Sequence, residues 1–390
     1  MDIVLAATIA TVALALLFDF TNGFHDSANA TSTVIATRSL TPYKAVALAT
    51  LFNFLPAFIV GTAVANTVAK VVDLVEMQRI SEGAVPYGIR VVLAALIGAV
   101  FWNFFTWHRG LPSSSSHALI GGLVGAGIAA GGTAIVNWDS VRNIAIALVA
   151  SPLIALLLAA IAVVAIRGLQ RLFSLDEDHV VFQGGQIASS AWVAWAHGAN
   201  DAQKTMGVVA AVLVSGGYMD VSANGDIHLP WWVVFGAYAA IAAGTFYGGW
   251  SIVETLGLRI TRVTRATGLA ANLGAVAAIL GATQAGVPVS TTQTVSGSIV
   301  GSGLGARRPV RLLVIRNMLV AWVLTAPAAA VVGWVVFHLT TLPRGFADVA
   351  TLGAILLLVA YAIYLMRTAV SEEDIAAELP SEESLAVSGD

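Results

Sequence analysis

Residues 18–29 read Phe-Asp-Phe-Thr-Asn-Gly-Phe-His-Asp-Ser-Ala-Asn, and they lie in a stretch that is otherwise hydrophobic enough to cross a membrane. A charged side chain at the centre of a bilayer costs about 2.5–3.5 kcal/mol on insertion scales, so an intramembrane acid such as Asp26 indicates a functional site. A second copy, Trp-Ala-His-Gly-Ala-Asn-Asp-Ala-Gln-Lys at residues 195–204, places Asp201 175 residues after Asp26. The chain therefore repeats one pattern around an acid.

The composition is that of a polytopic membrane protein. Of the 390 residues, 58% are hydrophobic and 11% are charged, whereas an ordinary soluble domain is about 25% charged. The first apolar stretch opens with Asp2 and lacks a clean cleavage site, so we interpret it as a retained helix and not as a signal peptide. The absence of cysteine excludes disulfides and thiolate metal sites. Apolar windows long enough to span a bilayer lie within residues 3–20, 44–64, 89–107, 143–166, 186–215, 230–250, 266–284, 310–338 and 346–366.

A second motif also occurs twice. Residues 110–125 read Gly-Leu-Pro-Ser-Ser-Ser-Ser-His-Ala-Leu-Ile-Gly-Gly-Leu-Val-Gly, and residues 286–301 read Gly-Val-Pro-Val-Ser-Thr-Thr-Gln-Thr-Val-Ser-Gly-Ser-Ile-Val-Gly. Pro112 follows Asp26 by 86 residues, and Pro288 follows Asp201 by 87. Two motifs in the same order at nearly the same separation indicate an internal duplication.

The placement of Lys and Arg predicts the orientation of the spans. If Arg38 and Lys44 are cytoplasmic and each Pro-Ser segment crosses once, most other basic residues are cytoplasmic too, and the loop 216–229, which has no base, is outside. The two halves are then inverted repeats, the arrangement of many secondary transporters. The Pro-Ser segments could instead be re-entrant hairpins, which would change individual crossings.

The predicted fold is an all-α polytopic membrane protein with about 10–12 transmembrane helices or half-helices in two inverted-topology repeats. We expect the first repeat at residues 1–166, a cytoplasmic connector at 167–183, the second repeat at 184–340 and a C-terminal transmembrane helix at 341–370. Residues 371–390 hold seven acids and no base, which predicts a disordered acidic tail.

The acid motifs combine cation ligands with anion donors. On a helix, Asp26 shares a face with Asn22 and Asn29, and Asp201 shares one with Lys204. Carboxylate and amide oxygens can coordinate a small cation, whereas amide and ammonium nitrogens can donate to an anion. The glycine three residues before each acid either lets the backbone unwind there or allows close helix packing.

The Pro-Ser motifs have the character of anion sites at helix starts. Proline suits the first turn of a helix, and the hydroxyls that follow lie where backbone N–H groups are unpaired and the helix dipole is positive. The two intramembrane acids would repel a bare oxyanion, so a cation or proton must accompany it. Entry of a divalent anion into a negative-inside cell is also opposed by about 2.3 kcal/mol per charge per 100 mV.

At these residues the sequence resembles the inorganic phosphate transporter (PiT) family, whose duplicated signature centres on a Gly-x-Asn-Asp-like core. The copies here read Gly-Phe-His-Asp-Ser-Ala-Asn from Gly23 and Gly-Ala-Asn-Asp-Ala-Gln-Lys from Gly198. The resemblance implies symport of inorganic phosphate with Na⁺ or H⁺ across the cell membrane, by a lipid-embedded homodimer. His25 and Lys204 depart from the simplest signature and are similar to bacterial members that use protons and carry phosphate as a neutral metal complex, which favours H⁺.

The residue chemistry and the resemblance together predict two sets of site residues. The coupling-ion set is Asn22, His25, Asp26 and Asp201. No catalytic residue, resident metal or cofactor is expected beyond the coupling ion and a divalent metal that travels with the substrate, and no nucleic acid partner is expected. The phosphate-binding set is Asn29, Ser114, Ser115, Ser116, Asn200, Gln203, Lys204, Ser290, Thr291 and Thr292.

Three alternatives stay open at the level of sequence. Sulfate is the nearest, although hydrogen phosphate can donate a hydrogen bond to an ionised acid and sulfate cannot. An intramembrane hydrolase using a serine with His117 is less favoured, because the second copy has Gln293 there and no nucleophile-elbow motif occurs. A passive anion channel would show flux that is independent of ion gradients.

Overall fold

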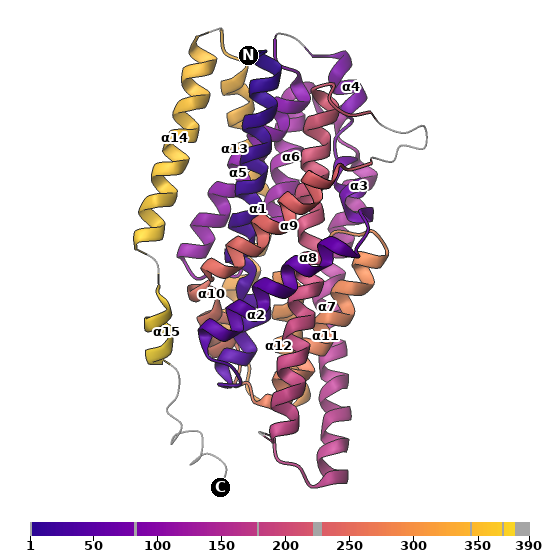
Figure 1. Cartoon of the computed structure of the whole chain (residues 1–390), viewed down its shortest axis with the longest axis vertical. Coiled ribbons are helices and arrows are strands. Elements are labelled where there is room, and N and C mark those ends of the chain that lie inside the picture. Colours follow the sequence, from indigo (N-terminus) through magenta and orange to yellow (C-terminus); the bar gives the residue numbers. More distant parts are fainter. Residues whose placement is uncertain are drawn as a thin grey trace.

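The computed structural model of the chain describes residues 2–81, 84–177, 179–220, 228–343, 345–368 and 370–378. Within these ranges the secondary structure is helical, and the helices form an elongated bundle (Figure 1). The helices are α1 (Ile3–Ala36), α2 (Pro42–Phe54), η1 (Leu55–Phe58), α3 (Ala63–Ala69), α4 (Leu74–Arg79), α5 (Tyr87–His108), α6 (Ser115–Gly131), η2 (Thr133–Ile135), α7 (Trp138–Phe173), α8 (Val180–Ser215), α9 (Trp231–Tyr247), α10 (Trp250–Glu254), η3 (Thr255–Arg259), α11 (Arg265–Gln284), α12 (Thr291–Gly305), α13 (Leu312–Thr340), α14 (Phe346–Arg367) and α15 (Glu372–Glu378).

The membrane spans are of two kinds. Six described helices are long and apolar enough to cross a bilayer, and two bent pairs raise the number to eight if each pair is one span. The pair α2–α3 bends by 86° and the pair α9–α10 by 68°. The apolar windows predicted at 44–64 and 230–250 coincide with these bent pairs. The first bend falls between Phe58, the last residue of η1, and Ala63, and the second follows Tyr247, where the C-cap Gly248 has a φ of 85°. The chain is a multi-pass membrane protein, as predicted.

The first helices of the two halves run in opposite directions. The end of α8 lies beside the start of α1, where Gly216 faces Thr8. The start of α8 lies beside the end of α1, where Thr37 Oγ1 and Ser39 Oγ donate to Gln186 Oε1 at 2.8 and 2.7 Å. This antiparallel pair is the inverted repeat that the duplicated motifs predict.

The two halves also exchange packing partners. The short helix α6 packs against α13, and its counterpart α12 packs against α7. Glycines make both contacts close: a Cβ on Gly125 would lie 2.0 Å from the carbonyl oxygen of Ala330, and a Cβ on Gly301 would lie 2.0 Å from that of Leu156. The small residues of the Pro-Ser motifs therefore serve helix packing between halves.

Each Pro-Ser motif forms the tip of a helical hairpin. The hairpin α5–α6 begins where Gly88 faces Ser215 and ends where Gly131 faces Ile80, so both of its ends lie near α4 and the end of α8. Its tip contacts His25 in the middle of α1. The hairpin α11–α12 has both of its ends at the opposite end of the molecule, next to Glu177. Each Pro-Ser segment therefore turns the chain back inside the molecule, and each hairpin begins and ends on one side, as a re-entrant hairpin does.

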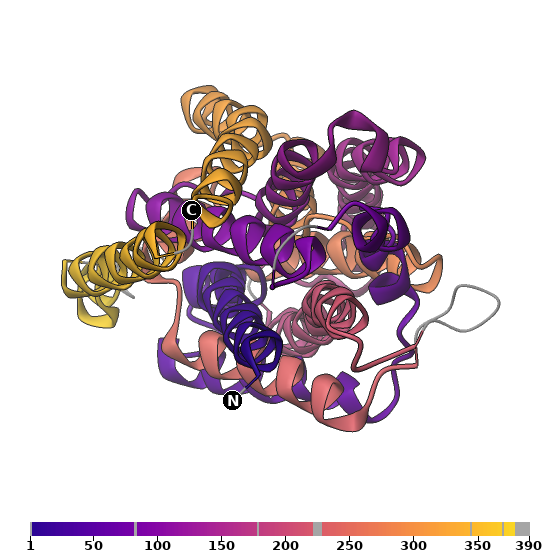
Figure 2. The same ribbon diagram turned by 90° about the horizontal axis from the view of Figure 1, so that it is seen from above.

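This topology keeps the predicted orientation. Arg308 pairs with Glu177 in the connection between α7 and α8 and donates to the Arg262 carbonyl. Arg171 lies in the last turn of α7, and Arg38 precedes Ser39, whose carbonyl accepts from Gln183 at the start of α8. The distribution of basic residues predicts that this end of the bundle is cytoplasmic. The opposite end holds the N-terminus and α4 (Figure 1). Helix α14 lies at the periphery of the bundle (Figure 2).

Two segments that were predicted to lie outside the repeats contain helical residues. In the connector predicted at 167–183, α7 extends to Phe173 and α8 begins at Val180. The tail predicted to be disordered from 371 starts with helix α15, which Ser371 and Asp374 cap reciprocally and in which Ile375 is buried. Residues 379–390 lie outside the described part of the chain. The other domain limits stay predictions.

Candidate functional site

The two signature acids meet where α1 and α8 pack against each other. Asp26 and Asp201 are 1% and 0% exposed, and Thr291 at the start of α12 lies between them. Thr291 Oγ1 is 3.1 Å from Asp26 Oδ2 and 3.3 Å from Asp201 Oδ2. Because the acids come from different halves and the hydroxyl from a hairpin tip, the centre depends on the relative position of all three elements.

His197 completes this centre, and sequence reasoning missed it. Its Nε2 lies 3.6 Å from Asp201 Oδ2 and 3.9 Å from Asp26 Oδ2, and ligand atoms of the three side chains all fall within 4.8 Å of one another. The signal was present in the sequence, because His197 precedes Asp201 by four residues, as Asn22 precedes Asp26.

The tautomer of His197 follows from its other nitrogen. Nδ1 lies 3.0 Å from Asn53 Oδ1, and Asn53 Nδ2 donates to Thr245 Oγ1 at 2.7 Å. The Asn53 oxygen is then an acceptor, so the ring proton sits on Nδ1 and the lone pair of Nε2 faces the two carboxylates. A lone pair opposite two carboxylate oxygens suits a cation or an added proton between them.

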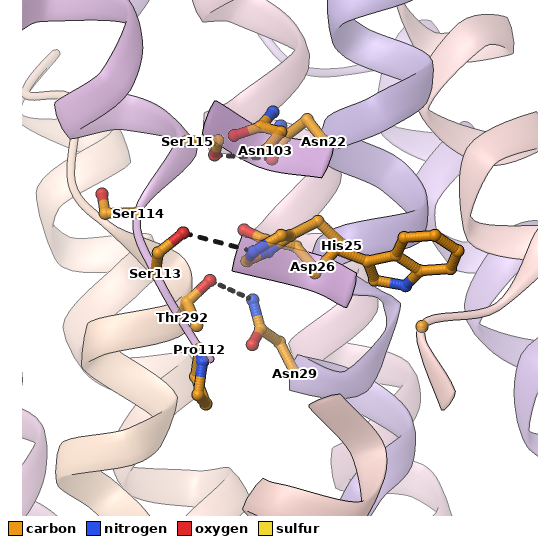
Figure 3. A network of polar contacts seen from close by, with 12 residues as sticks. Asn22, His25, Asp26, Asn29, Asn103, Pro112, Ser113, Ser114, Ser115 and Thr292 are labelled. Carbon is orange, nitrogen blue, oxygen red and sulfur yellow. Dashed lines mark hydrogen bonds and ion pairs between the residues drawn. The ribbon is translucent and has the colours of Figure 1, made fainter. Parts of the chain in front are cut away.

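The first-half acid has its own polar shell (Figure 3). His25 Nδ1 lies 2.7 Å from Asp26 Oδ1, and its Nε2 lies 3.2 Å from Thr106 Oγ1 and 3.3 Å from Ser113 Oγ. Thr106 and Ser113 belong to the first hairpin, so His25 connects Asp26 to that hairpin. Ser113 is one of the hydroxyls after Pro112 that the sequence predicts at the anion site, whereas Thr106 was not predicted as part of the site.

Asn22 links the first half to the acid of the second. Its Nδ2 donates to Asp201 Oδ2 at 3.2 Å, and its Oδ1 accepts from Ser115 Oγ at 2.6 Å. Both ends of the amide are therefore used on protein groups. Asn22 positions Asp201 relative to the first hairpin.

Lys204 joins the two hairpin tips. Its Nζ donates to Asp201 Oδ1 at 2.7 Å, to Ser116 Oγ at 2.6 Å and to the Val289 carbonyl at 2.7 Å. Ser116 Oγ also donates to the Val289 carbonyl at 3.0 Å. All three ammonium protons have protein acceptors, and the side chain is 2% exposed.

Apart from Ser116 and Lys204, the predicted phosphate residues fall into two groups. Asn29, Ser115, Thr291 and Thr292 lie beside the acids; Asn29 Nδ2 is 3.4 and 3.3 Å from Thr291 and Thr292 Oγ1, and its buried Oδ1 has no hydrogen-bond partner. These side chains can present donors to an oxyanion at the start of α12.

The residues of the second group form helix caps and hydrogen bonds that fix neighbouring segments of the protein. Ser114 and Ser290 cap α6 and α12 by accepting from the backbone N–H three residues later. Asn200 donates to Thr283 and accepts from the Val289 N–H, and Gln203 accepts from the Val64 N–H. The hydrogen bond between the Val64 N–H and Gln203 attaches α3 to α8, and both residues are buried.

The glycines before the acids allow close approach of neighbouring helices. A Cβ on Gly23 would lie 2.1 Å from the Ile241 carbonyl oxygen, and one on Gly198 would lie 2.3 Å from that of Asn53. Helices α1 and α8 are continuous through both positions. The alternative that the backbone unwinds there is wrong.

The sequence of the chain is similar to those of known proteins. Residues 22–181 and 170–333 match the phosphate transporter family. The chain is 42% identical over 328 residues to a protein of Rhizobium meliloti named "Probable low-affinity inorganic phosphate transporter", covering 82% of this chain and 92% of that protein. A Bacillus subtilis protein of the same name is 40% identical over 340 residues, covering 87% and 98%.

A solved structure is also similar. It is described as "The sodium-dependent phosphate transporter" and has a TM-score of 0.74 at 24% identity, covering 86% of this chain and 99% of that chain. At this identity the similarity concerns the fold. From the family match and the sequence relatives, the chain belongs to the phosphate transporter family.

Proposed function

We propose that this chain is a secondary active symporter of the cell membrane that imports inorganic phosphate together with a coupling cation, H⁺ or Na⁺. The observation that carries the proposal is the buried cluster of Asp26, Asp201 and His197 Nε2 around Thr291. It places cation ligands and the first turn of a helix at one point.

The charges of the cluster favour binding of phosphate together with a cation or a proton. Lys204 compensates Asp201, whereas the titratable side chains paired with Asp26 are the imidazoles of His25 and His197. Hydrogen phosphate would add two negative charges to this buried site. A cation or proton between the acids lowers the electrostatic cost of that addition, which is the physical basis of symport.

The hydroxyl groups define the place for phosphate. Ser115 and Thr291 are the first residues of α6 and α12, so an oxyanion between them meets two helix N-termini. Thr292 and the Asn29 amide lie beside Thr291. A phosphate hydroxyl could donate to an acid there, whereas sulfate offers no such donor.

The coupling ion belongs between the acids. The predicted residues Asp26 and Asp201 are the charged ligands, and His197 adds a nitrogen. Asn22 and His25 hold the carboxylates in place by hydrogen bonds. The homodimer and the divalent metal that accompanies the substrate stay predictions.

Uptake of radiolabelled phosphate into proteoliposomes tests the function. Na⁺ and H⁺ gradients are imposed separately, with and without Mg²⁺, and unlabelled sulfate serves as competitor. We expect gradient-driven accumulation that excess phosphate abolishes and sulfate does not. Phosphate flux that is independent of both gradients would indicate a passive channel. Competition by sulfate would indicate that the protein also accepts sulfate as a substrate.

A further inference from the structure

Asp19 is a buried acid that the site described above does not use. It lies two turns before Asp26 on α1, its side chain is 0% exposed, and neither carboxylate oxygen has a hydrogen-bond partner. The 175-residue offset between the halves matches it with Ala194. The duplicated fold therefore does not require an acid at this position.

The surroundings of Asp19 place it on the outer side of the acid pair. Because α1 and α8 are antiparallel, Asp19 lies on the same side of the acids as Lys204 and Thr205, toward the end where Gly216 faces Thr8. The Thr205 hydroxyl and the Asn22 amide are the polar groups that approach its oxygens. Neither reaches hydrogen-bonding geometry, and Thr205 Oγ1 is itself buried without a partner.

The charged and titratable side chains that face Asp19 come from two packed helices. They are Asp201 and Lys204 of α8 and Tyr238 of α9. The ammonium of Lys204 is fully committed to Asp201, Ser116 and Val289. The Tyr238 hydroxyl is buried and has no partner. An ionised Asp19 would thus add a negative charge near Asp201 with no donor of its own.

We infer that Asp19 is a proton-binding carboxyl, protonated in this conformation, and that it carries a coupling proton from the outer side of the site. This inference rests on the proposed phosphate symport and adds the ion and the residue that binds it. A buried carboxylate without hydrogen bonds costs far more than a neutral acid. Hard cations gather about six oxygen ligands, which Asp19 and Thr205 do not supply, so a proton fits this place better than a metal cation.

The position also connects the proton to the substrate site. When Asp19 loses its proton, its negative charge acts on the ammonium of Lys204, which holds both hairpin tips, and on the carboxylate of Asp201. Deprotonation therefore weakens the attachment of the tips to α8. Proton binding at Asp19 restores it.

The test compares Asp19→Asn, Asp19→Glu and wild type in proteoliposomes, with Asp139→Asn as the matched control, because Asp139 is an exposed acid paired with Arg142 at one end of the bundle. A pH dye records proton entry, and labelled phosphate records uptake. We expect Asp19→Asn to keep phosphate exchange but to move one proton fewer per phosphate, and Asp19→Glu to retain proton movement. Asp139→Asn should match wild type in both.

A second readout does not depend on transport. Infrared difference spectra of purified protein between acidic and alkaline buffers should contain the carbonyl band of a protonated carboxylic acid that Asp19→Asn lacks. An unchanged proton-to-phosphate ratio, or an unchanged band, in a folded Asp19→Asn protein would overturn the inference. Wild-type uptake driven by Na⁺ without proton movement would overturn it and leave phosphate symport standing, whereas no phosphate uptake by wild type would contradict the proposed function itself.

Discussion

Asp26 and Asp201 face the same hydroxyl: Thr291 Oγ1 lies 3.1 Å from one carboxylate and 3.3 Å from the other. A hydroxyl has one proton, so it donates to one acid at a time. The acids come from opposite halves of the duplication, and the hydroxyl comes from the tip of the second hairpin. Movement of that tip therefore changes how the two acids share a proton or a cation.

The Thr291 hydroxyl is the first target for mutation. A hydrogen bond to a charged group contributes about 1.5–3 kcal/mol, so Thr291→Val should lower phosphate uptake at least about tenfold, and Thr291→Ser should restore it. Thr294→Val is the control, because Thr294 Oγ1 bonds the Ser290 carbonyl in its own helix. Equal loss in both valine variants would mean that the effect is one of helix packing.

The Lys204–Asp201 pair should be a stability determinant. Breaking a buried ion pair costs about 3–5 kcal/mol, so Lys204→Gln and Asp201→Asn should each lower the melting temperature of the purified protein clearly. The double variant should lose less than the sum of the two, with a coupling energy of about 0.5–3 kcal/mol. Additive losses would contradict the pairing. If Lys204 only bound phosphate, its removal would leave the stability unchanged. We expect a loss of stability because all three N–H groups of its ammonium donate to protein acceptors.

Cysteine labelling can test the re-entrant hairpins, because the chain has no cysteine of its own. Ala84 and Thr133 are exposed residues on either side of the first hairpin. Single cysteines at these positions should react with an impermeant reagent from the same face of the membrane. Thr41 and Asp220 are the controls and should react from opposite faces. Labelling of Ala84→Cys and Thr133→Cys from opposite faces would mean that the segment crosses fully.

The packing glycines give a matched comparison. Gly125→Ala and Gly301→Ala would each push a Cβ to 2.0 Å from a carbonyl oxygen of the other half, and such overpacking costs about 1–3 kcal/mol. Gly184 is also helical but has nothing within 4 Å of its Cβ position, so Gly184→Ala should be neutral or stabilise by up to about 1 kcal/mol. Thermal unfolding in detergent measures all three; similar melting temperatures would argue against close helix packing.

The sequence predicts the architecture because the duplicated motifs encode it. The acid motif and the Pro-Ser motif occur twice in the same order, around Asp26 and around Asp201. The distribution of basic residues predicts which end of the bundle is cytoplasmic. Sequence alone could not decide whether the Pro-Ser segments cross, because α6 and α12, with 17 and 15 residues, are apolar and only slightly shorter than a membrane span. The bends after Phe58 and Tyr247 were not predicted, since a hydropathy window averages over them.

The site was predicted in part. Residues such as Thr291 and Asn29 do lie beside the acids, because they share the helix faces that the motif spacing defines. Asn200 and Gln203 accept hydrogen bonds from the backbone N–H groups of Val289 and Val64 and so fix neighbouring segments in place. The sequence did not predict this role, because these partners are distant along the chain. His197 was missed because an i−4 position gains meaning only when the opposite acid is seen to be near.

The most direct test of the account is accumulation of labelled phosphate by proteoliposomes containing wild type or Asp26→Asn under the same imposed gradient. Asp26 lies beside Asp201, Thr291 and His197, so its charge should be needed to couple cation and phosphate. We predict that wild type accumulates phosphate above equilibrium with the medium, while Asp26→Asn remains folded and accumulates none. Wild-type accumulation by Asp26→Asn would contradict the central role of the acid pair.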